Sequence, residues 1–203
     1  KLKRSFISPH QSFPQLKLMI FAEIENCKNG LPSGIWLKCN SLVDHRLIGL
    51  LYEASQAGVP IEIMARGVCC LRPGVAGLSE TITVRSIIGR FLEHGRIYVF
   101  ANGDEFLSDK NIVMISSADL MPRNLRRRVE CFMRLENPTI RKQVLHQIMV
   151  ALLRDEKNSW YLQPDGSYVH PQTDETSFSC HEYFMSNPSL SGLGSLAATQ
   201  DNG

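Results

Sequence analysis

Apolar positions recur along this 203-residue chain at two spacings, and the alternation of these spacings predicts the order of its elements. Leu16, Ile20 and Ile24 repeat at helical intervals between Ser12 and Asn29, which predicts an amphipathic helix. Short apolar runs bounded by turn residues are typical of buried strands. Such runs predict strands at 35–39, 59–65, 97–100, 112–115 and 129–135.

The first two predicted strands are joined by a second helical pattern at residues 47–54, which Gly58 closes. A strand, a helix and another strand of these lengths predict a βαβ unit. Polar residues that follow the carboxyl ends of strands in such units gather at a ligand crevice. Residues 40–41 and 66–67 occupy that position, so we expect a binding site there.

The rest of the chain predicts further helices, a hairpin and a tail. Residues 84–93 return to helical spacing, and Asn137-Pro138 begins a long helix. Residues 122–128 predict a basic turn or short helix, and 160–169 a hairpin. We therefore expect one α/β domain at 1–171, with a mixed β-sheet flanked by helices. Residues 172–203 are rich in Ser, Thr, Asn and Gly, which predicts a flexible tail.

Composition narrows the class of protein. The formal net charge is only +2, too small for a general attraction to nucleic acid. Six cysteines show neither a Cys-x-x-Cys pair nor a metal-ligand spacing, so we expect reduced thiols. No run approaches the roughly 18 apolar residues of a membrane span. These patterns predict a cytoplasmic protein without a nucleic-acid partner or a transmembrane segment.

Arginines and glycines concentrate between Met64 and Arg96, so anion binding is expected there. Arginine donors match phosphate oxygens, and glycines let backbone amides approach an anion. This composition is typical of a polyphosphate or nucleotide site. The candidate residues are His94 and five arginines, Arg66, Arg72, Arg85, Arg90 and Arg96.

Each candidate also has a structural interpretation. His94 alone is more often a surface histidine at a helix end, although imidazole is the obvious proton carrier for phosphate transfer. For Arg66 a salt-bridged structural role is equally natural. Each of the other arginines alone favours a solvated face, whereas their clustering favours a shared function. The polar run at 116–119 follows a predicted strand and is a weak signal alone.

Longer blocks of the chain resemble the C-terminal part of class-1 bacterial polyphosphate kinases. The resemblance runs from about Lys17 to Pro171, and its blocks are far more specific than a short motif. Because the chain begins at Lys1 and not at methionine, we expect a fragment of a longer polypeptide. The blocks that carry the resemblance are 40–44, 52–59, 66–74, 78–80, 84–94 and 117–125.

The resemblance implies an enzyme that transfers the terminal phosphate of ATP reversibly to inorganic polyphosphate. It implies four domains, Mg²⁺ and a phosphohistidine intermediate. The last two domains resemble the halves of a phospholipase D-like site, and this chain resembles the last one. The phosphorylated histidine would lie in the preceding domain, outside this chain. Mg²⁺ would bind mainly through ATP and that domain, with no metal ligand in this fragment.

Individual residues fall on family positions. Arg66 and His94 match ATP-contacting positions, which implies that Arg66 clamps phosphates and that His94 is catalytic at the leaving ADP oxygen. By charge and proximity alone, we expect the remaining four arginines to line a polyphosphate channel; they are Arg72, Arg85, Arg90 and Arg96.

Two departures concern the phospholipase D-like pattern. Residues 94–96, His-Gly-Arg, stand where such halves have His-x-Lys. Residues 117–119, Ser-Ala-Asp, stand where they have Gly-Ser-x-Asn, and Ser116 replaces the glycine. The missing lysine counts against a phospholipase D-like hydrolase, which would need two complete halves or a homodimer.

A noncatalytic polyphosphate- or nucleotide-binding module remains a second alternative, because it needs the arginines without acid–base chemistry. The fragment alone is expected to be inactive. The expected partners are ATP or ADP, inorganic polyphosphate, the preceding domains of the same polypeptide and, at full length, further copies of the enzyme. Membrane association of the full-length enzyme stays open.

Overall fold

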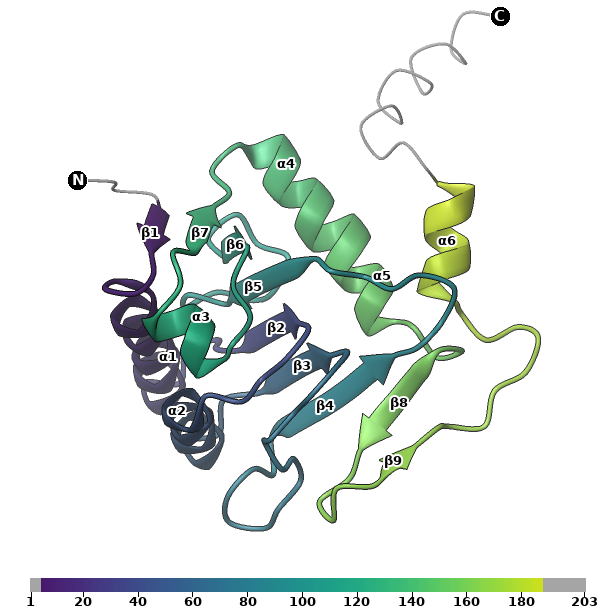
Figure 1. Ribbon diagram of the computed structural model, residues 1–203, viewed down its shortest axis with the longest axis horizontal. Helices are drawn as coiled ribbons and strands as arrows, with labels where there is room; N and C mark the ends of the chain where they lie inside the picture. The colour runs from purple at the N-terminus through teal and green to yellow at the C-terminus, as the bar shows by residue number, and fades with distance from the viewer. Residues whose placement is uncertain (1–4, 188–203) are drawn as a thin grey trace, which may run out of the picture.

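A nine-stranded mixed sheet organises the computed structural model, which describes residues 5–187 (Figure 1). Its strand order is β1-β7-β6-β5-β2-β3-β4-β8-β9, with β2, β3 and β4 parallel and all other neighbours antiparallel. The expected α/β class is confirmed. The strands are β1 Ser5–Ile7, β2 Ile35–Cys39, β3 Ile61–Ala65, β4 Ile82–Ile87, β5 Arg96–Phe100, β6 Ile112–Ser116, β7 Cys131–Arg134, β8 Ser159–Leu162 and β9 Tyr168–Val169.

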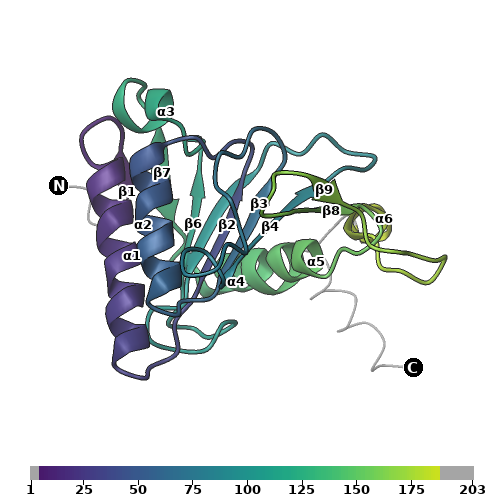
Figure 2. The same cartoon turned by 90° about the horizontal axis from the view of Figure 1, so that it is seen from below.

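Helices cover both faces of the sheet. Figure 2 shows α1 and α2 together on one side, and the rod that contains α4 and α5 on the other. None of the helices within 5–187 is long and apolar enough to cross a membrane. The helices are α1 Ser12–Lys28, α2 His45–Gln56, α3 Pro122–Arg126, α4 Pro138–Lys142, the π-helical segment η1 Gln143–Met149, α5 Val150–Leu153 and α6 Cys180–Ser186.

Alternation along the strands divides the core into two layers. Ile61 and Ile63 of β3 are buried in the layer beneath α1 and α2. Met64 faces the second layer, together with Leu145 and Met149 of the α4–α5 rod. Successive side chains of a strand point to opposite faces, so one short apolar run serves both layers. The predicted βαβ unit is confirmed as β2-α2-β3.

The helix expected at residues 84–93 is wrong. Residues 82–87 form β4, which pairs in parallel with β3 and antiparallel with β8, and the following residues 88–95 lead into β5 without a helix. Ile82, Thr83 and Val84 are β-branched, and two neighbouring strands satisfy their backbone groups. Long-range pairing therefore overrides the local helical spacing.

The flexible tail expected at 172–203 also differs from the structure in its first part. Residues 180–186 form α6, in which Cys180 and His181 are buried. The Ser179 side chain accepts a hydrogen bond from the Glu182 amide at the start of α6, and the Cys180 amide donates to Asp155. These caps and the buried pair dock the helix. The remaining residues of the expected tail, 188–203, lie outside the described part.

Replacing either of two glycines by alanine is expected to change the stability of the protein, in opposite directions. Gly49 lies inside α2 with open space where a Cβ would stand. We expect Gly49→Ala to raise the free energy of unfolding by about 0.5–1 kcal/mol, because alanine restricts the unfolded chain. Chemical denaturation measures this change.

The control is Gly67→Ala, whose Cβ would lie 2.9 Å from the backbone oxygen of Asn40. That oxygen belongs to a strand end that cannot easily move, so this variant should be destabilised. Destabilisation by Gly49→Ala would contradict the first expectation.

Candidate functional site

Four strand ends meet at one edge of the sheet. The parallel strands β2 and β3 end there, and the antiparallel strand β5 begins there. The strand β6 also ends at this edge, because Arg96 at the start of β5 lies opposite Ser116 at the end of β6. Residues that are far apart in the sequence are therefore brought together at this edge, as expected for an α/β sheet.

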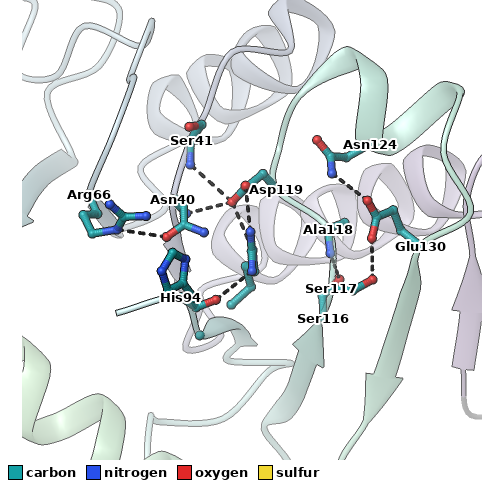
Figure 3. Close-up of polar contacts among 12 residues, drawn as sticks. Asn40, Ser41, Arg66, His94, Ser116, Ser117, Ala118, Asp119, Asn124 and Glu130 are labelled. Carbon is teal, nitrogen blue, oxygen red and sulfur yellow. Dashed lines mark hydrogen bonds and ion pairs between the residues drawn. The ribbon is translucent and has the colours of Figure 1, made fainter. Parts of the chain in front are cut away.

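The carboxylate of Asp119 connects these strand ends (Figure 3). Its Oδ1 accepts the backbone amide of Asn40 at 2.8 Å and that of Ser41 at 3.3 Å. Arg96 reaches both carboxylate oxygens, with Nε 3.2 Å from Oδ1 and Nη2 2.9 Å from Oδ2. Burial works to raise the pKa of Asp119, but the hydrogen bonds from Arg96, Asn40 and Ser41 outweigh it and the pKa is lowered.

Arg66 is held through a single nitrogen. Its Nε donates to the Asn40 side-chain oxygen at 3.1 Å and to the Glu93 backbone carbonyl at 3.0 Å. Within residues 5–187 its two terminal nitrogens have no hydrogen-bond partner. The side chain is oriented by the protein and keeps a planar pair of donors for an anion.

His94 lies in the exposed segment between β4 and β5 and not at a helix end. Its backbone carbonyl accepts a hydrogen bond from Arg96 Nη1 at 2.8 Å. In Figure 3 no interaction joins its ring to the other residues drawn. The imidazole is therefore accessible, while the backbone that carries it is held.

The turn at residues 116–118 is closed by hydroxyl groups. Ser116 Oγ donates to the Cys131 carbonyl at 2.8 Å and accepts the Ala118 amide at 2.9 Å. The Ser117 hydroxyl donates to Glu130, whose other carboxylate oxygen accepts from Asn124 at 2.7 Å. Ser116 thus gives the turn a side-chain bond that glycine could not supply. Sequence reasoning missed Glu130, because nothing local links it to the turn.

Arg85 does not line an open channel, contrary to the sequence-based expectation. Its side chain is only 8% exposed. One terminal nitrogen pairs with Glu62 at 3.0 Å and the other donates to the Leu153 carbonyl at 2.7 Å. The guanidinium also lies over the Tyr161 ring, so it links β3, β4, β8 and α5.

The other channel candidates lie in three different settings. Arg96 uses all three guanidinium nitrogens for Asp119 and the His94 carbonyl. Arg72 is exposed and contacts the Pro164 carbonyl in the β8–β9 turn, at the opposite end of β4. Arg90 is exposed and makes no hydrogen bond or ion pair within the described part of the chain. The site therefore brings together Arg66, His94 and Arg96, and leaves out Arg72 and Arg85.

A cavity of about 320 Å³ opens beside Arg66. Arg66, Gly67 and Ser86 form its polar side, and Ile88, Trp160 and Tyr168 its apolar side. The β8–β9 hairpin was predicted, but its position beside the site was not. Pairing of β8 with β4 places it there, and no local pattern indicates that pairing.

Glu93, Cys180 and His181 place their ligand atoms within 4.8 Å of one another, a geometry that could hold a metal ion. Hydrogen bonding opposes this use. The Phe91 amide donates to His181 Nδ1, which assigns the imidazole proton to Nε2, the nitrogen that faces Glu93. Burial also raises the pKa of the Cys180 thiol. A metal ion needs a thiolate and an imidazole nitrogen without a proton. Thiol and imidazole are also not preferred ligands of Mg²⁺.

Comparison with known sequences identifies relatives of this chain. The family profile described as polyphosphate kinase C-terminal domain 2 matches residues 6–180. A polyphosphate kinase from Erythrobacter litoralis is 52% identical over 96% of this chain and 27% of its own length. One from Synechocystis is 46% identical over 90% of this chain and 24% of its own. The chain thus spans about a quarter of these curated relatives.

Comparison with solved structures agrees with the sequence comparison. Polyphosphate kinase from Porphyromonas gingivalis superposes with a TM-score of 0.85 at 32% identity, over 93% of this chain and 28% of that one. A phospholipase D family member from Salmonella typhimurium gives a TM-score of 0.50 at 12% identity, over 79% and 97% of the two chains, which shows a shared fold only. The chain therefore belongs to the polyphosphate kinase family, in which it corresponds to C-terminal domain 2.

Proposed function

We propose that this chain forms one wall of a polyphosphate kinase active site, which transfers the terminal phosphate of ATP reversibly to inorganic polyphosphate. The observation that carries the proposal is that two groups suited to ATP lie at one sheet edge. Arg66 has terminal nitrogens without a partner within residues 5–187, and the ring of His94, which follows the Glu93 carbonyl that holds Arg66, is accessible. Both lie at the sheet edge where Asp119 connects the strand ends. Membership of the family supports the same reaction.

Arg66 would bind the phosphate chain of ATP. A guanidinium held through Nε presents two parallel donors, which match two oxygens of one phosphate or of two neighbouring phosphates. In phosphoryl transfer these donors stabilise the charge on the oxygens of the transferred group. Because the protein already orients the guanidinium, little reorganisation accompanies the reaction.

His94 would act on the leaving group. The bond between the terminal phosphorus and the ADP oxygen breaks as a histidine of the preceding domain attacks that phosphorus. His94 donates a hydrogen bond or a proton to the released ADP oxygen. In the second step a terminal oxygen of polyphosphate attacks the phosphohistidine, and the histidine leaves. In this proposed scheme the nucleophile lies outside this chain.

Within residues 5–187, the carboxylates of Asp119 and Glu93, which lie nearest Arg66 and His94, do not fit a Mg²⁺ site. Asp119 is committed to Arg96, and Glu93 lies 2.9 Å from Lys38 and 3.2 Å from His181. Neither carboxylate is free for a hard cation that prefers several oxygen ligands. We accordingly place Mg²⁺ on the phosphates of ATP and on the preceding domain, and assign no step in this chain to it.

A phospholipase D-like hydrolase is less well supported. The cation at the lysine position is Arg96, which is neutralised by Asp119. A noncatalytic binding module needs Arg66 but not His94. Phosphodiester hydrolysis by the purified chain would favour the hydrolase, whereas a full-length enzyme indifferent to His94 would favour the binding module.

Replacing His94 tests the catalytic role. We expect His94→Ala in the full-length enzyme to lower polyphosphate synthesis by about 10²-fold or more, because general acids contribute on this scale. Steady-state synthesis from ATP measures the effect. His10→Ala is the control, because His10 is an exposed histidine in the turn between β1 and α1. Normal turnover of His94→Ala would remove His94 from the mechanism.

Replacing Arg66 tests phosphate binding. We expect Arg66→Ala to weaken ATP binding by about tenfold or more, the scale of a charge-assisted hydrogen bond. Arg66→Lys keeps the charge but loses the fork, so it should recover only part of the affinity. Titration of ATP under non-turnover conditions provides the comparison. Wild-type affinity in the alanine variant would end the assignment.

The stabilisation that Asp119 provides is expected to be lost in acid. Because folding lowers its pKa, its contribution to stability is complete above the ordinary aspartate value of about 3.9 and is lost as the pH falls through the lowered pKa. We expect Asp119→Asn to lose about 1–3 kcal/mol of unfolding free energy near pH 7 and to have a flatter stability curve below pH 4. Denaturant titrations at several pH values measure both.

The control for Asp119 is Asp109→Asn. The Asp109 side chain is 97% exposed, although it pairs with Arg141 at 2.7 Å, so its loss should cost little. Equal costs of the two substitutions would contradict the central role of Asp119.

A further inference from the structure

Residues 88–95, which we call the His94 loop, are fixed mainly by groups from other elements. Arg66 Nε binds the Glu93 carbonyl and Lys38 Nζ binds the Gly95 carbonyl, each at 3.0 Å. The Phe91 amide points at Nδ1 of His181, 3.4 Å away. A loop without helix or strand hydrogen bonds depends on such contacts for its conformation.

His181 is the member of this set that comes from α6. It is 2% exposed, and its Nε2 lies 3.2 Å from Glu93 Oε1. The second oxygen of Glu93 lies 2.9 Å from Lys38 Nζ. The neutral imidazole thus accepts from the loop backbone through Nδ1 and donates to a loop side chain through Nε2. Both ring nitrogens are used for the same loop.

The loop packs directly on the imidazole. A Cβ at Gly89 would lie 2.4 Å from His181 Nδ1 and 2.9 Å from the Asn158 side-chain oxygen. The Phe91 ring meets His181 edge-on, with centroids 5.2 Å apart. Glycine at position 89 is therefore required for this approach, because any side chain would push the loop away from α6.

We propose that His181 is a positioning residue of the kinase, which holds the His94 loop in the conformation that presents His94 to the phosphoryl group. The inference rests on the proposed role of His94. His181 is buried and does not reach substrate, so it acts through the backbone and Glu93. Small displacements of a catalytic group reduce turnover strongly. Arg66 also donates to the Asn40 side-chain oxygen, which lies outside the loop, so ATP binding by Arg66 should change less.

The test uses the full-length enzyme. We expect His181→Ala to lower kcat by about tenfold or more, with a change in the KM for ATP of less than about threefold. His181→Asn places an acceptor near the Nδ1 position and should recover part of kcat. His181→Gln places a donor near the Nε2 position and should recover part independently. Equal kcat values for all three variants and the wild type would overturn the proposal.

Two further variants distinguish a loss of loop positioning from a general loss of protein stability. Gly89→Ala displaces the loop without removing a buried side chain, and should also lower kcat more than it raises KM. Glu23→Gln provides the matched control, because Glu23 is 1% exposed and accepts the amides of Gly34 and Asn102, away from the loop. If Glu23→Gln and His181→Ala lower kcat equally at equal loss of thermal stability, His181 is structural only.

The outcomes separate this inference from the proposed function. An inactive His94→Ala variant with normal His181→Ala and Gly89→Ala variants would overturn the positioning role alone. Normal turnover by His94→Ala would overturn the proposed catalytic role of His94, on which this inference rests. Stoichiometric zinc in the purified protein, lost in His181→Gln, would overturn the hydrogen-bonding role of His181 in favour of a metal site.

Discussion

The carboxylate of Asp119 is the constraint on which the site depends. Two backbone amides at the end of β2 and a bidentate guanidinium at the start of β5 converge on it. Each of these donors would otherwise be an incompletely satisfied group at a strand end, where sheet pairing stops. One buried anion thus satisfies donors at the end of β2 and at the start of β5. It also fixes Asn40, which orients Arg66.

The same ion pair determines which cations remain for a ligand. Arg96 forms an ion pair with Asp119, and Arg85 binds Glu62 and the Leu153 carbonyl, so neither guanidinium is available to a ligand. Arg66 is held only at Nε and keeps its terminal nitrogens without partners in the part of the chain that the structure describes. The cluster looks uniform in the sequence but divides into arginines held by structural partners, such as Arg85 and Arg96, and arginines whose terminal nitrogens have no partner within residues 5–187. Of the second kind, Arg66 is the one that the protein holds at the site. Local charge density alone could not make that division, because the partners are up to 68 residues away in the chain.

Periodicity predicted most of the fold. The long helices, the βαβ unit and the β8–β9 hairpin follow from apolar spacing and turn residues, which are local signals. The strand β4 was missed because Ile87, Ile88 and Phe91 happen to have helical spacing, while its true partners are β3 and β8. Arg66 and His94 were identified by family resemblance. Their supports at Asp119, Glu130 and His181 depend on contacts across the sheet, which no local pattern contains.

The contacts of α6 with the His94 loop place the C-terminal boundary of the domain beyond residue 171. A domain that ended at residue 171 would contain Arg66, His94 and Asp119. It would leave Glu93 with Lys38 as its side-chain partner, the Phe91 amide without its acceptor, and empty space against Gly89. Unpaired buried groups and lost packing both favour movement of the loop. The residues that hold the loop therefore extend to His181, one position past the family match at residue 180. A boundary drawn from composition separates the proposed catalytic histidine from its buried support.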